Sequence, residues 1–324
     1  MKIVFYGSNA GTFRLGFEEH LADADRYEII AVSDGLTGPD DFNHFEIADV
    51  IVGTSLGGKH PRPDRLRLYH VPGAGIDSID ASLLPDGAKL CNCFGHEHAI
   101  AEYVMAALLQ RPVPLNDADA RLRQGEWRYW AGRSDALRPE LSGQTIGLLG
   151  FGHIGKAIAV RAKAFGMRIH VANRTQPSSN DIVDKAFSLN DLPVFMESAD
   201  AIVVSLPLTE TTDAMIGAAE LGAMRSHAVI INVGRGPVIQ QQALFDVLTN
   251  ETIGGAIIDT WYQYPANETE KTLPAGLPFQ ELDNVIMTPH MSGWTHGTVN
   301  RRQTTIAENI RRLANGEALL NQIS

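Results

Sequence analysis

A glycine-rich turn between an apolar run and a helical pattern restricts the fold of this chain more than any other feature. The segment from Thr145 to Arg174 reads TIGLLGFGHIGKAIAVRAKAFGMRIHVANR. Residues 146–149 predict a short buried strand, the apolar spacing after them predicts a helix capped near Gly166, and residues 168–172 predict a second strand. The segment is therefore expected to form a strand–helix–strand unit of an α/β fold.

The three glycines of this turn follow the pattern G-x-G-x-x-G. Gly150 would make the tight turn, Gly152 would let the backbone approach a ligand closely, and Gly155 would let the helix pack closely on the strand. A pyrophosphate fits, because N–H groups at a helix N-terminus and the helix dipole attract an anion. The alternative is a glycine-rich turn without a ligand, but the strand–turn–helix context favours a dinucleotide site.

Length and charge limit the organisation and the partners of the chain. At 324 residues it exceeds one ordinary domain, which predicts two domains with buried cores. Its formal net charge of -11, from 38 acidic and 27 basic side chains, argues against nucleic acid or an anionic membrane as a partner. A small anionic substrate is compatible with this charge only where positive side chains gather in a cleft.

The cysteines need no special role, and the apolar segments favour a cytoplasmic protein. Cys91 and Cys93 would share one face of a strand, and as buried apolar side chains they need no metal or redox role. The sequence shows no signal peptide and no unbroken apolar span of about 18 residues.

Short apolar strands alternate with helical segments, which predicts two parallel-sheet α/β domains, Rossmann-like or flavodoxin-like, separated by a cleft. The first is expected to be a substrate-binding domain of residues 1–95 and 294–324, and the second a dinucleotide-binding domain of residues 96–293. Residues 99–109 predict a buried helix that links the domains or forms a subunit interface. A helix is also expected in FRLGFEEHLAD, and strands in MKIVFYG, YEIIAVSD, DVIVG, RLYHVPGAG, AKLCNCFG and residues 201–206, 228–233, 255–259 and 284–288.

Six motifs follow one another along the chain. They read VPGAGIDSID, HAIAEYVMAALL, GLLGFGHIGKAIA, SLPLTETT, INVGRGPVI and NVIMTPHMSGWT. In this order they resemble the motifs of the D-isomer-specific 2-hydroxyacid dehydrogenases, a family that includes glyoxylate and hydroxypyruvate reductases, phosphoglycerate dehydrogenase and formate dehydrogenase. The resemblance implies an enzyme that transfers a hydride between NAD(P)H and a small 2-oxo acid.

Reduction of a 2-oxo acid needs a cation for the carboxylate and the carbonyl, and a proton donor for the developing alkoxide. Arg235 follows an apolar strand, so its planar guanidinium is expected at the carboxyl end of the sheet, where ligands bind. His290 also follows a strand, and histidine can give and take a proton near neutral pH. The alternatives are a surface arginine and a structural histidine, and the family motifs favour the catalytic roles.

The resemblance also implies binding residues. The backbone N–H groups of Ala74 and Gly75 are implied to bind the substrate carboxylate, and His96 is either a pocket residue or a structural one. The run of His96 to His98 lacks further ligands, so no metal site is expected. The expected cofactor residues are Gly150, Gly152, His153, Ile154, Gly155, Asn173, Arg174, Thr175, Leu206, Pro207, Thr212, Val233 and Asp259.

The end of the second strand of the glycine-rich unit departs from the pattern of NAD-dependent relatives. They carry an acidic residue there, which accepts hydrogen bonds from the ribose hydroxyls. This chain has Asn173, followed by Arg174. Without a carboxylate to repel it, a 2′-phosphate could pair with the guanidinium, so NADP is favoured over NAD.

The partner of the histidine is a second departure. The family usually places a glutamate where this chain reads DTWYQYP, with Tyr264 at that position and Gln263 beside it. Either residue is therefore a candidate for positioning His290. Formate dehydrogenases also have a neutral residue there, but they carry an asparagine in the substrate loop where this chain has His96.

We therefore expect a cytoplasmic, homodimeric dehydrogenase with Arg235, His290 and Tyr264 as catalytic residues and a small 2-oxo acid such as glyoxylate or hydroxypyruvate as substrate. Oxidation of a small anion, in the manner of formate dehydrogenase, is the enzymatic alternative. A dinucleotide-sensing binding protein is the alternative from another class, because corepressors that resemble this family use the same fold. The presence of both Arg235 and His290 argues against it.

Overall fold

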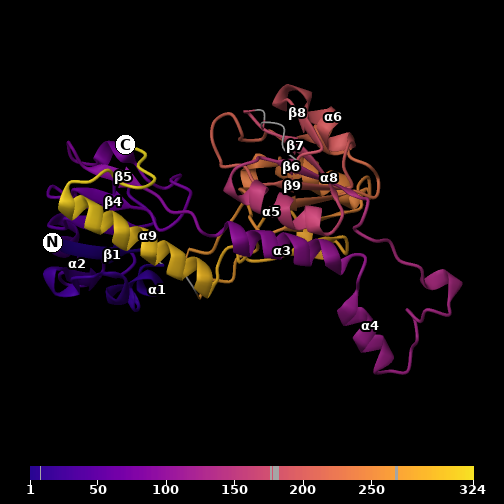
Figure 1. Cartoon of the computed structure of the whole chain (residues 1–324), viewed down its shortest axis with the longest axis horizontal. Helices are drawn as coiled ribbons and strands as arrows, with labels where there is room; N and C mark the ends of the chain where they lie inside the picture. Colours follow the sequence, from indigo (N-terminus) through magenta and orange to yellow (C-terminus); the bar gives the residue numbers. More distant parts are fainter. Residues whose placement is uncertain (8, 176, 178–181, 267–268) are drawn as a thin grey trace. The chain divides into compact units, whose positions relative to one another are not determined.

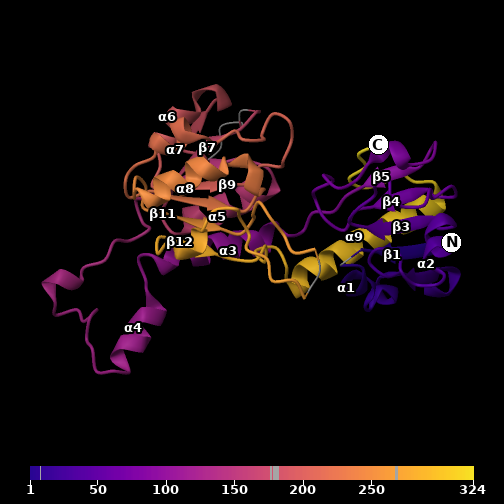
Figure 2. The same ribbon diagram turned by 180° about the vertical axis from the view of Figure 1, so that it is seen from behind.

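The computed structural model describes residues 1–7, 9–175, 177, 182–266 and 269–324. The chain divides into two compact units, one of residues 1–95 with 295–324 and the other of residues 96–294. Figures 1 and 2 show both units. Each unit is built on a parallel sheet with helices on its faces, which confirms the predicted class of two parallel-sheet α/β domains.

The first unit has a sheet of five parallel strands in the order β2-β1-β3-β4-β5. This is the order of flavodoxin-like sheets. The inner strands β1, β3 and β4 are buried on both faces because they are nearly continuous apolar runs, whereas the edge strand β2 is exposed or half-buried. Helices α1 (Ala10–Arg14) and α9 (His296–Asn315) cover one face, and α2 (Asp41–Glu46) covers the other (Figure 1). The strands are β1 (Lys2–Tyr6), β2 (Glu28–Ala31), β3 (Val50–Gly53), β4 (Leu68–His70) and β5 (Lys89–Cys91).

The segment FRLGFEEHLAD does not form one helix, so that prediction is wrong. Helix α1 ends at Arg14, and the backbone of Leu15 is extended. Gly16 then has φ = 69°, a left-handed conformation that interrupts a right-handed helix, and Phe17–His20 forms a separate 3-10 turn. The break lets both Phe13 and Phe17 enter the core.

The second unit has seven parallel strands in the order β12-β11-β10-β9-β6-β7-β8. Chain order reverses between β6 and β9, which is where ligands bind in doubly wound sheets. Helices α3 (Glu97–Gln110) and α5 (His153–Ala164) pack on one face, and α6 (Leu192–Glu197), α7 (Ala218–Gly222) and α8 (Gln241–Thr249) cover the other (Figure 2). The strands are β6 (Thr145–Leu149), β7 (Arg168–Ala172), β8 (Lys185–Phe187), β9 (Ala201–Val204), β10 (Val229–Asn232), β11 (Gly255–Ile258) and β12 (Val285–Met287).

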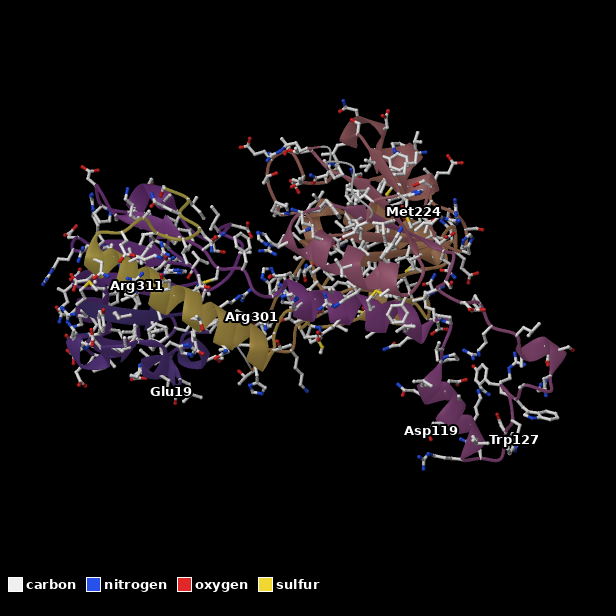
Figure 3. All side chains as sticks on the ribbon, viewed as in Figure 1. Glu19, Asp119, Trp127, Met224, Arg301 and Arg311 are labelled. Carbon is white, nitrogen blue, oxygen red and sulfur yellow. The ribbon has the colours of Figure 1, made fainter. Side chains whose placement is uncertain are left out.

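Residues 113–140 form an arm that joins helix α3 to strand β6. The arm begins with helix α4 (Leu115–Leu122), and Figure 1 draws it outside the layered part of the second unit. None of its residues belongs to the hydrophobic clusters found among the described residues. Figure 3 labels Asp119 and Trp127, two side chains of this arm.

The described residues offer neither a membrane-spanning helix nor a cluster of metal ligands. None of the helices within the described ranges combines the length and the apolarity that crossing a membrane demands. In the same ranges, no three His, Cys, Asp or Glu side chains gather in a way that could hold a metal ion. Cys91 and Cys93 are both buried, and burial raises the pKa of their thiols to about 11 and about 12.

Candidate active site

Three neighbouring strands of the second unit end beside the candidate catalytic residues. Arg235 follows β10, Asp259 directly follows β11, and His290 follows β12. These strands are adjacent and parallel, so the three loops leave the same edge of the sheet. The sequence patterns thus converge in space within one unit.

The loop that carries Arg235 is held by the buried side-chain amide of Asn232. Asn232 accepts a hydrogen bond from the N–H of Gly234 at 3.0 Å and donates one to the carbonyl of Arg235 at 3.0 Å. A side chain at Gly236 would collide with the carbonyl group of Trp261, so only glycine fits there. The backbone of Arg235 is therefore held in place while its side chain remains half-buried.

The loop that carries His290 is held by a fully buried carboxylate. Asp259 accepts hydrogen bonds from the hydroxyl of Thr288 at 2.6 Å and from the N–H groups of Met291 at 2.9 Å and Ser292 at 3.0 Å. His290 itself has φ = 54°, a left-handed conformation that costs a residue other than glycine about 1–3 kcal/mol. Since hydrogen bonds to a charged group contribute about 1.5–3 kcal/mol each, those of Asp259 can offset this cost.

Tyr264 is the residue that contacts the histidine ring. Its hydroxyl lies 3.1 Å from Nδ1 of His290, and it accepts a hydrogen bond from the N–H of Trp261 at 3.1 Å. The side chain of Tyr264 is half-exposed, and partial burial raises the pKa of the phenol. The N–H of Trp261 and the charge of Arg235 lower that pKa and Asp259 raises it, so both charged groups lie within electrostatic range of Tyr264. The structure shows no such contact for Gln263, the other candidate, which is exposed.

The glycine-rich turn has the shape that a dinucleotide requires. Gly150 has φ = 98°, and a side chain at Gly155 would collide with the carbonyl oxygen of Gly150. A side chain at Gly152 would instead project into open space, which leaves room for a ligand beside the N-terminus of α5. His153 is exposed and Ile154 is half-buried at that end of the helix. The residues present therefore fit a bound pyrophosphate.

Asn173 bridges two loops at the end of β7. Its side-chain oxygen accepts a hydrogen bond from the N–H of Phe151 at 3.2 Å, and its amide donates to the carbonyl of Thr175 at 2.8 Å. The side chains of Arg174 and Thr175 are exposed. Asn173 thus shapes the glycine-rich turn, and Arg174 is the residue next to it that offers a positive charge to solvent.

The other expected cofactor residues surround the ends of β9 and β10. Leu206 and Val233 are buried in the core of the unit, whereas Pro207 is exposed. Thr212 donates a hydrogen bond to the carbonyl of Pro207 at 2.6 Å and so closes the loop between them. Asp259 is also among the expected cofactor residues, and the partners that the structure gives it belong to the histidine loop.

The expected substrate residues are divided between the units. Ala74 and Gly75 lie in the first unit, after β4, where Asn92 donates a hydrogen bond to the carbonyl of Ala74 at 2.8 Å. His96 lies in the second unit, buried at the start of α3, and a Cβ atom placed on Gly293 would lie 3.3 Å from its Cβ. His96 therefore packs against the loop that follows His290.

Sequence reasoning missed the residues that support the site. Asn232, Thr288 and Trp261 are buried or half-buried polar groups at strand ends, and Tyr103 reaches Thr288 from helix α3 with 2.7 Å between the hydroxyl oxygens. Asn232 is the one for which a signal existed, because an amide at the end of an apolar strand needs a hydrogen-bond partner. No such signal existed for Tyr103.

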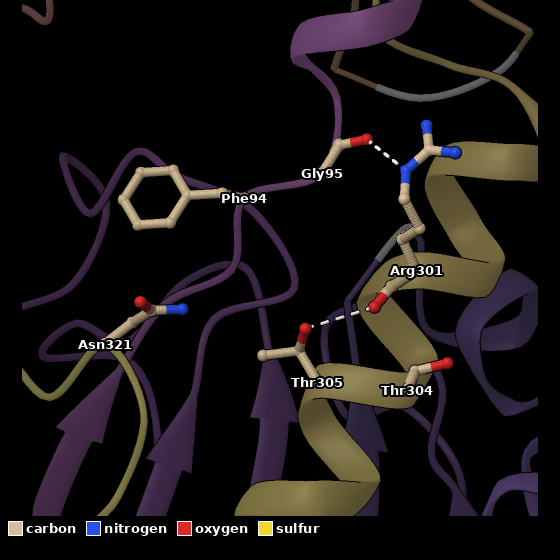
Figure 4. A pocket seen from close by; sticks show the side chains of 6 residues that line it. All are labelled: Phe94, Gly95, Arg301, Thr304, Thr305 and Asn321. Carbon is tan, nitrogen blue, oxygen red and sulfur yellow. Dashed lines mark hydrogen bonds between the residues drawn. The ribbon is translucent and has the colours of Figure 1, made fainter. Parts of the chain in front are cut away.

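A cavity of about 300 Å³ lies apart from these residues, within the first unit (Figure 4). Its walls include Phe94, Asn321 and Arg301, and Arg301 donates a hydrogen bond from Nε to the carbonyl of Gly95 at 2.7 Å. It contains none of the predicted site residues. We therefore do not place the reaction there.

The chain is similar to known proteins in sequence and in fold. The family model described as "D-isomer specific 2-hydroxyacid dehydrogenase, NAD binding domain" matches residues 105–292. A glyoxylate reductase of Korarchaeum cryptofilum is 30% identical over 264 residues, which cover 80% of this chain and 76% of that protein.

Two solved structures extend the likeness to the whole chain. A D-isomer-specific 2-hydroxyacid dehydrogenase family protein of Aeromonas salmonicida superposes with a TM-score of 0.80 at 25% identity, covering 100% of this chain and 98% of that one. A D-isomer-specific 2-hydroxyacid dehydrogenase of Xanthobacter autotrophicus Py2, solved in complex with NADPH and MES, superposes with a TM-score of 0.76 at 25% identity, covering 100% and 97%.

Proposed function

The chain belongs to the D-isomer-specific 2-hydroxyacid dehydrogenase family, and we propose that it reduces a small 2-oxo acid of the glyoxylate or hydroxypyruvate kind to the D-2-hydroxy acid with NAD(P)H. The contact between Tyr264 and His290 carries the proposal, because it orients a proton donor at the sheet edge where Arg235 also emerges. The glyoxylate reductase relative supports the substrate class.

Each group has its own role in the proposed reaction. The bound nicotinamide would supply the hydride, held by the turn of Gly150, Gly152 and Gly155. Arg235 binds the substrate carboxylate and polarises the carbonyl, and His290 gives a proton from Nε2 to the developing alkoxide.

Tyr264 is the group that orients the imidazole in this scheme. Its oxygen accepts a hydrogen bond from Nδ1–H of protonated His290, while the N–H of Trp261 fixes the position of that oxygen. Because Nδ1 keeps its proton when Nε2 gives one away, the hydrogen bond to the phenol survives the proton transfer. Since Nδ1 is engaged by Tyr264, Nε2 is the ring nitrogen that faces the substrate.

A panel of 2-oxo acids tests the proposal. Glyoxylate, hydroxypyruvate and pyruvate are each offered with NADH and with NADPH, and the chirality of any product with a stereocentre is determined. Turnover to the D-isomer supports the assignment. Formate-dependent reduction of NAD(P)+ without 2-oxo acid turnover would instead support the formate alternative, which the neutral partner of His290 favours. Dinucleotide binding without any turnover would point to a sensing protein.

NADPH is the cofactor that we expect this enzyme to prefer. No carboxylate stands at Asn173, and the guanidinium of Arg174 is exposed beside it. Arg174→Ala should therefore remove most of the preference in kcat/KM for NADPH over NADH, while turnover with NADH hardly changes. Arg168→Ala is the matched control, because Arg168 is an exposed arginine at the opposite end of the same strand. A parent enzyme that prefers NADH tenfold or more would contradict the prediction.

The assembly that we propose is a homodimer. The arm of residues 113–140 supports it, because this segment holds large exposed apolar side chains that the described residues of its own chain do not cover. Such side chains mark interaction surfaces.

A further inference from the structure

The loop implied to bind the substrate carboxylate is held by the residues that follow the neighbouring strand. The loop comes after β4, and β4 pairs with β5. Two residues directly after β5 donate hydrogen bonds to carbonyl groups of the loop. The N–H of Cys93 donates to the carbonyl of Gly73 at 2.9 Å, and the side-chain amide of Asn92 donates to the carbonyl of Ala74 at 2.8 Å. All four residues belong to the first unit.

These two hydrogen bonds determine where the N–H groups of the loop point. A trans peptide unit is planar, and its N–H points away from its carbonyl. The carbonyl of Gly73 shares a peptide unit with the N–H of Ala74, and the carbonyl of Ala74 shares one with the N–H of Gly75. Within the described residues, no acceptor lies within hydrogen-bond distance of these two N–H groups. They are therefore available to an anion on the side of the loop that faces away from Asn92.

Asn92 is itself held by Asn321 in the C-terminal segment of the chain. The N–H of Asn92 donates to the carbonyl of Asn321 at 3.3 Å, and the side-chain amide of Asn321 donates to the carbonyl of Asn92 at 3.3 Å. The segment continues along β5, where the N–H of Ile323 donates to the carbonyl of Leu90 at 2.8 Å. Figure 4 labels Asn321. The backbone of Asn92 is thus fixed, and its amide meets the carbonyl of Ala74 from a defined position.

We infer that Asn92 is a positioning residue for the substrate carboxylate: it orients the peptide unit between Ala74 and Gly75, and Asn321 holds Asn92 in place. Asn92 is buried, so water does not readily replace its hydrogen bond to the loop. The inference rests on the proposed function, because it takes the substrate to be a 2-oxo acid whose carboxylate this loop binds.

Two substitutions separate the amide of Asn92 from its support. Asn92→Leu keeps the approximate size of the side chain and removes the donor to Ala74. Asn321→Gly removes the side-chain bond to Asn92 but suits the backbone at this position, where φ is 51°. Asn284→Leu is the matched control, because it removes an asparagine amide that donates to the carbonyl of Leu248 in the second unit.

The expected effect is on binding of the carboxylate. KM for the 2-oxo acid should rise about tenfold in Asn92→Leu and about threefold in Asn321→Gly, since a hydrogen bond to a charged group is weakened. The dissociation constant of oxamate, a carboxylate analogue of the substrate, should rise in proportion in the complex with the dinucleotide. kcat should change less than about twofold, because the carboxylate is bound alike in the ground state and the transition state. Dinucleotide affinity should stay as in the parent, and Asn284→Leu should match the parent throughout.

A readout that needs no turnover separates this inference from the proposed function. The full-length protein is prepared with isotope-labelled glycine, and the NMR amide signal of Gly75 is identified by its loss in Gly75→Ala. We expect Asn92→Leu to move this signal, Asn321→Gly to move it less, and Asn284→Leu to leave it in place. A parent protein with neither 2-oxo acid turnover nor oxamate binding would reject the function, while the signal of Gly75 would still decide whether Asn92 orients the loop.

Two results would overturn the inference. One is a KM and a Gly75 signal in Asn92→Leu that coincide with those of Asn284→Leu. The other is a loss of dinucleotide affinity in Asn92→Leu as large as the rise in KM, which would indicate general damage to the fold. If Asn92→Leu does not fold, Asn321→Gly decides, because Asn321 is exposed and its side chain fills no core. A KM and a Gly75 signal as in the parent are then the negative outcome.

Discussion

At the scale of single residues, Arg235 combines a fixed backbone with a side chain that solvent can reach. Asn232 makes hydrogen bonds to the N–H of Gly234 and to the carbonyl of Arg235, so the backbone that carries the guanidinium is fixed. The loop therefore loses little freedom when the guanidinium binds an anion. A planar fork on such a base can bind a carboxylate with two parallel hydrogen bonds. The loop is therefore suited to an α-carboxylate more than to a single point charge.

Arg235→Ala should lower kcat/KM for the 2-oxo acid by about 100- to 1000-fold, because charge-assisted hydrogen bonds to the substrate are lost in the transition state. Arg235→Lys should restore only part of the activity, since an ammonium group lacks the fork. The steady-state rates are compared with those of Arg161→Ala, a half-buried arginine of the same unit on helix α5. Activity of Arg235→Ala within tenfold of the parent would reject the role, and dinucleotide affinity should hardly change.

The phenol beside His290 makes a second prediction. Reduction needs protonated His290, so kcat/KM should fall as pH rises through the pKa of the imidazole. Tyr264→Glu adds a carboxylate that stabilises the imidazolium, and the falling limb should move to higher pH. Tyr264→Phe should lower the rate without adding charge, because the ring of His290 is held less firmly. Identical pH profiles of the three proteins would show that Tyr264 is not the partner of His290.

The sequence allowed prediction of the residues that we propose to face ligands, but not of the residues that hold these side chains in place. Arg235, His290 and Tyr264 stand in motifs whose spacing is informative without a structure. Tyr103 lies 185 positions before Thr288, and a tyrosine on an apolar helix gives no sign that its hydroxyl turns toward a distant loop. Such contacts depend on how α3 packs against the sheet, which local patterns do not encode.

At the scale of elements, a buried histidine attaches α9 to the sheet of the first unit. His70 ends β4, and its Nε2 lies 2.9 Å from the amide nitrogen of Asn309 on α9. The amide can only donate, so Nε2 must be unprotonated. Burial lowers the pKa of His70 to about 4, opposed in part by the carbonyl of Val71. Protonation would break the bond between the two elements.

This predicts a loss of stability in mild acid. The folded pKa of His70 lies below the unfolded value, so the unfolded chain binds the extra proton and stability falls as pH drops from about 6.5 toward 4. Between pH 7 and pH 5 the parent should lose about 2 kcal/mol more than His70→Gln, whose side chain does not titrate. Urea unfolding at both pH values measures this, with His98→Gln as the exposed control. Equal losses in the parent and in His70→Gln would contradict it.

The elements themselves were predicted well where buried strands formed continuous apolar runs. Helical patterns were less reliable. The periodicity of FRLGFEEHLAD predicts one helix, but Gly16 adopts a left-handed conformation that divides the segment. In α5, Val160 keeps the helical spacing but is exposed, and the buried face comprises Gly155, Ile158, Ala159 and Ala162.

At the scale of the whole molecule, the arm of residues 113–140 is held in shape by its own hydrogen bonds. Tyr129 donates a hydrogen bond to Asp117 at 2.7 Å, and Arg121 bonds the same carboxylate at 2.7 Å. The arm still exposes apolar surface: Trp127 is 62% and Trp130 is 57% accessible. An ordered segment with uncovered aromatic side chains is typical of an interface. Other exposed apolar residues of the arm are Leu115, Leu122 and Leu137.

We expect the protein to be a homodimer in solution and the two tryptophans to be central to its interface. A tryptophan buries about 150–250 Å² in a contact, and truncation of such a residue at an interface costs about 2 kcal/mol or more. Trp127→Ala and Trp130→Ala should each raise the dimer dissociation constant by about 30-fold or more, measured by sedimentation equilibrium. Phe42→Ala, which removes an exposed aromatic residue of the first unit, should leave it unchanged. Neither tryptophan lies in a hydrophobic core. The melting temperature of each variant as a monomer should therefore match that of the parent as a monomer. A monomeric parent, or a double variant that dimerises as tightly as the parent, would show that the arm has another partner.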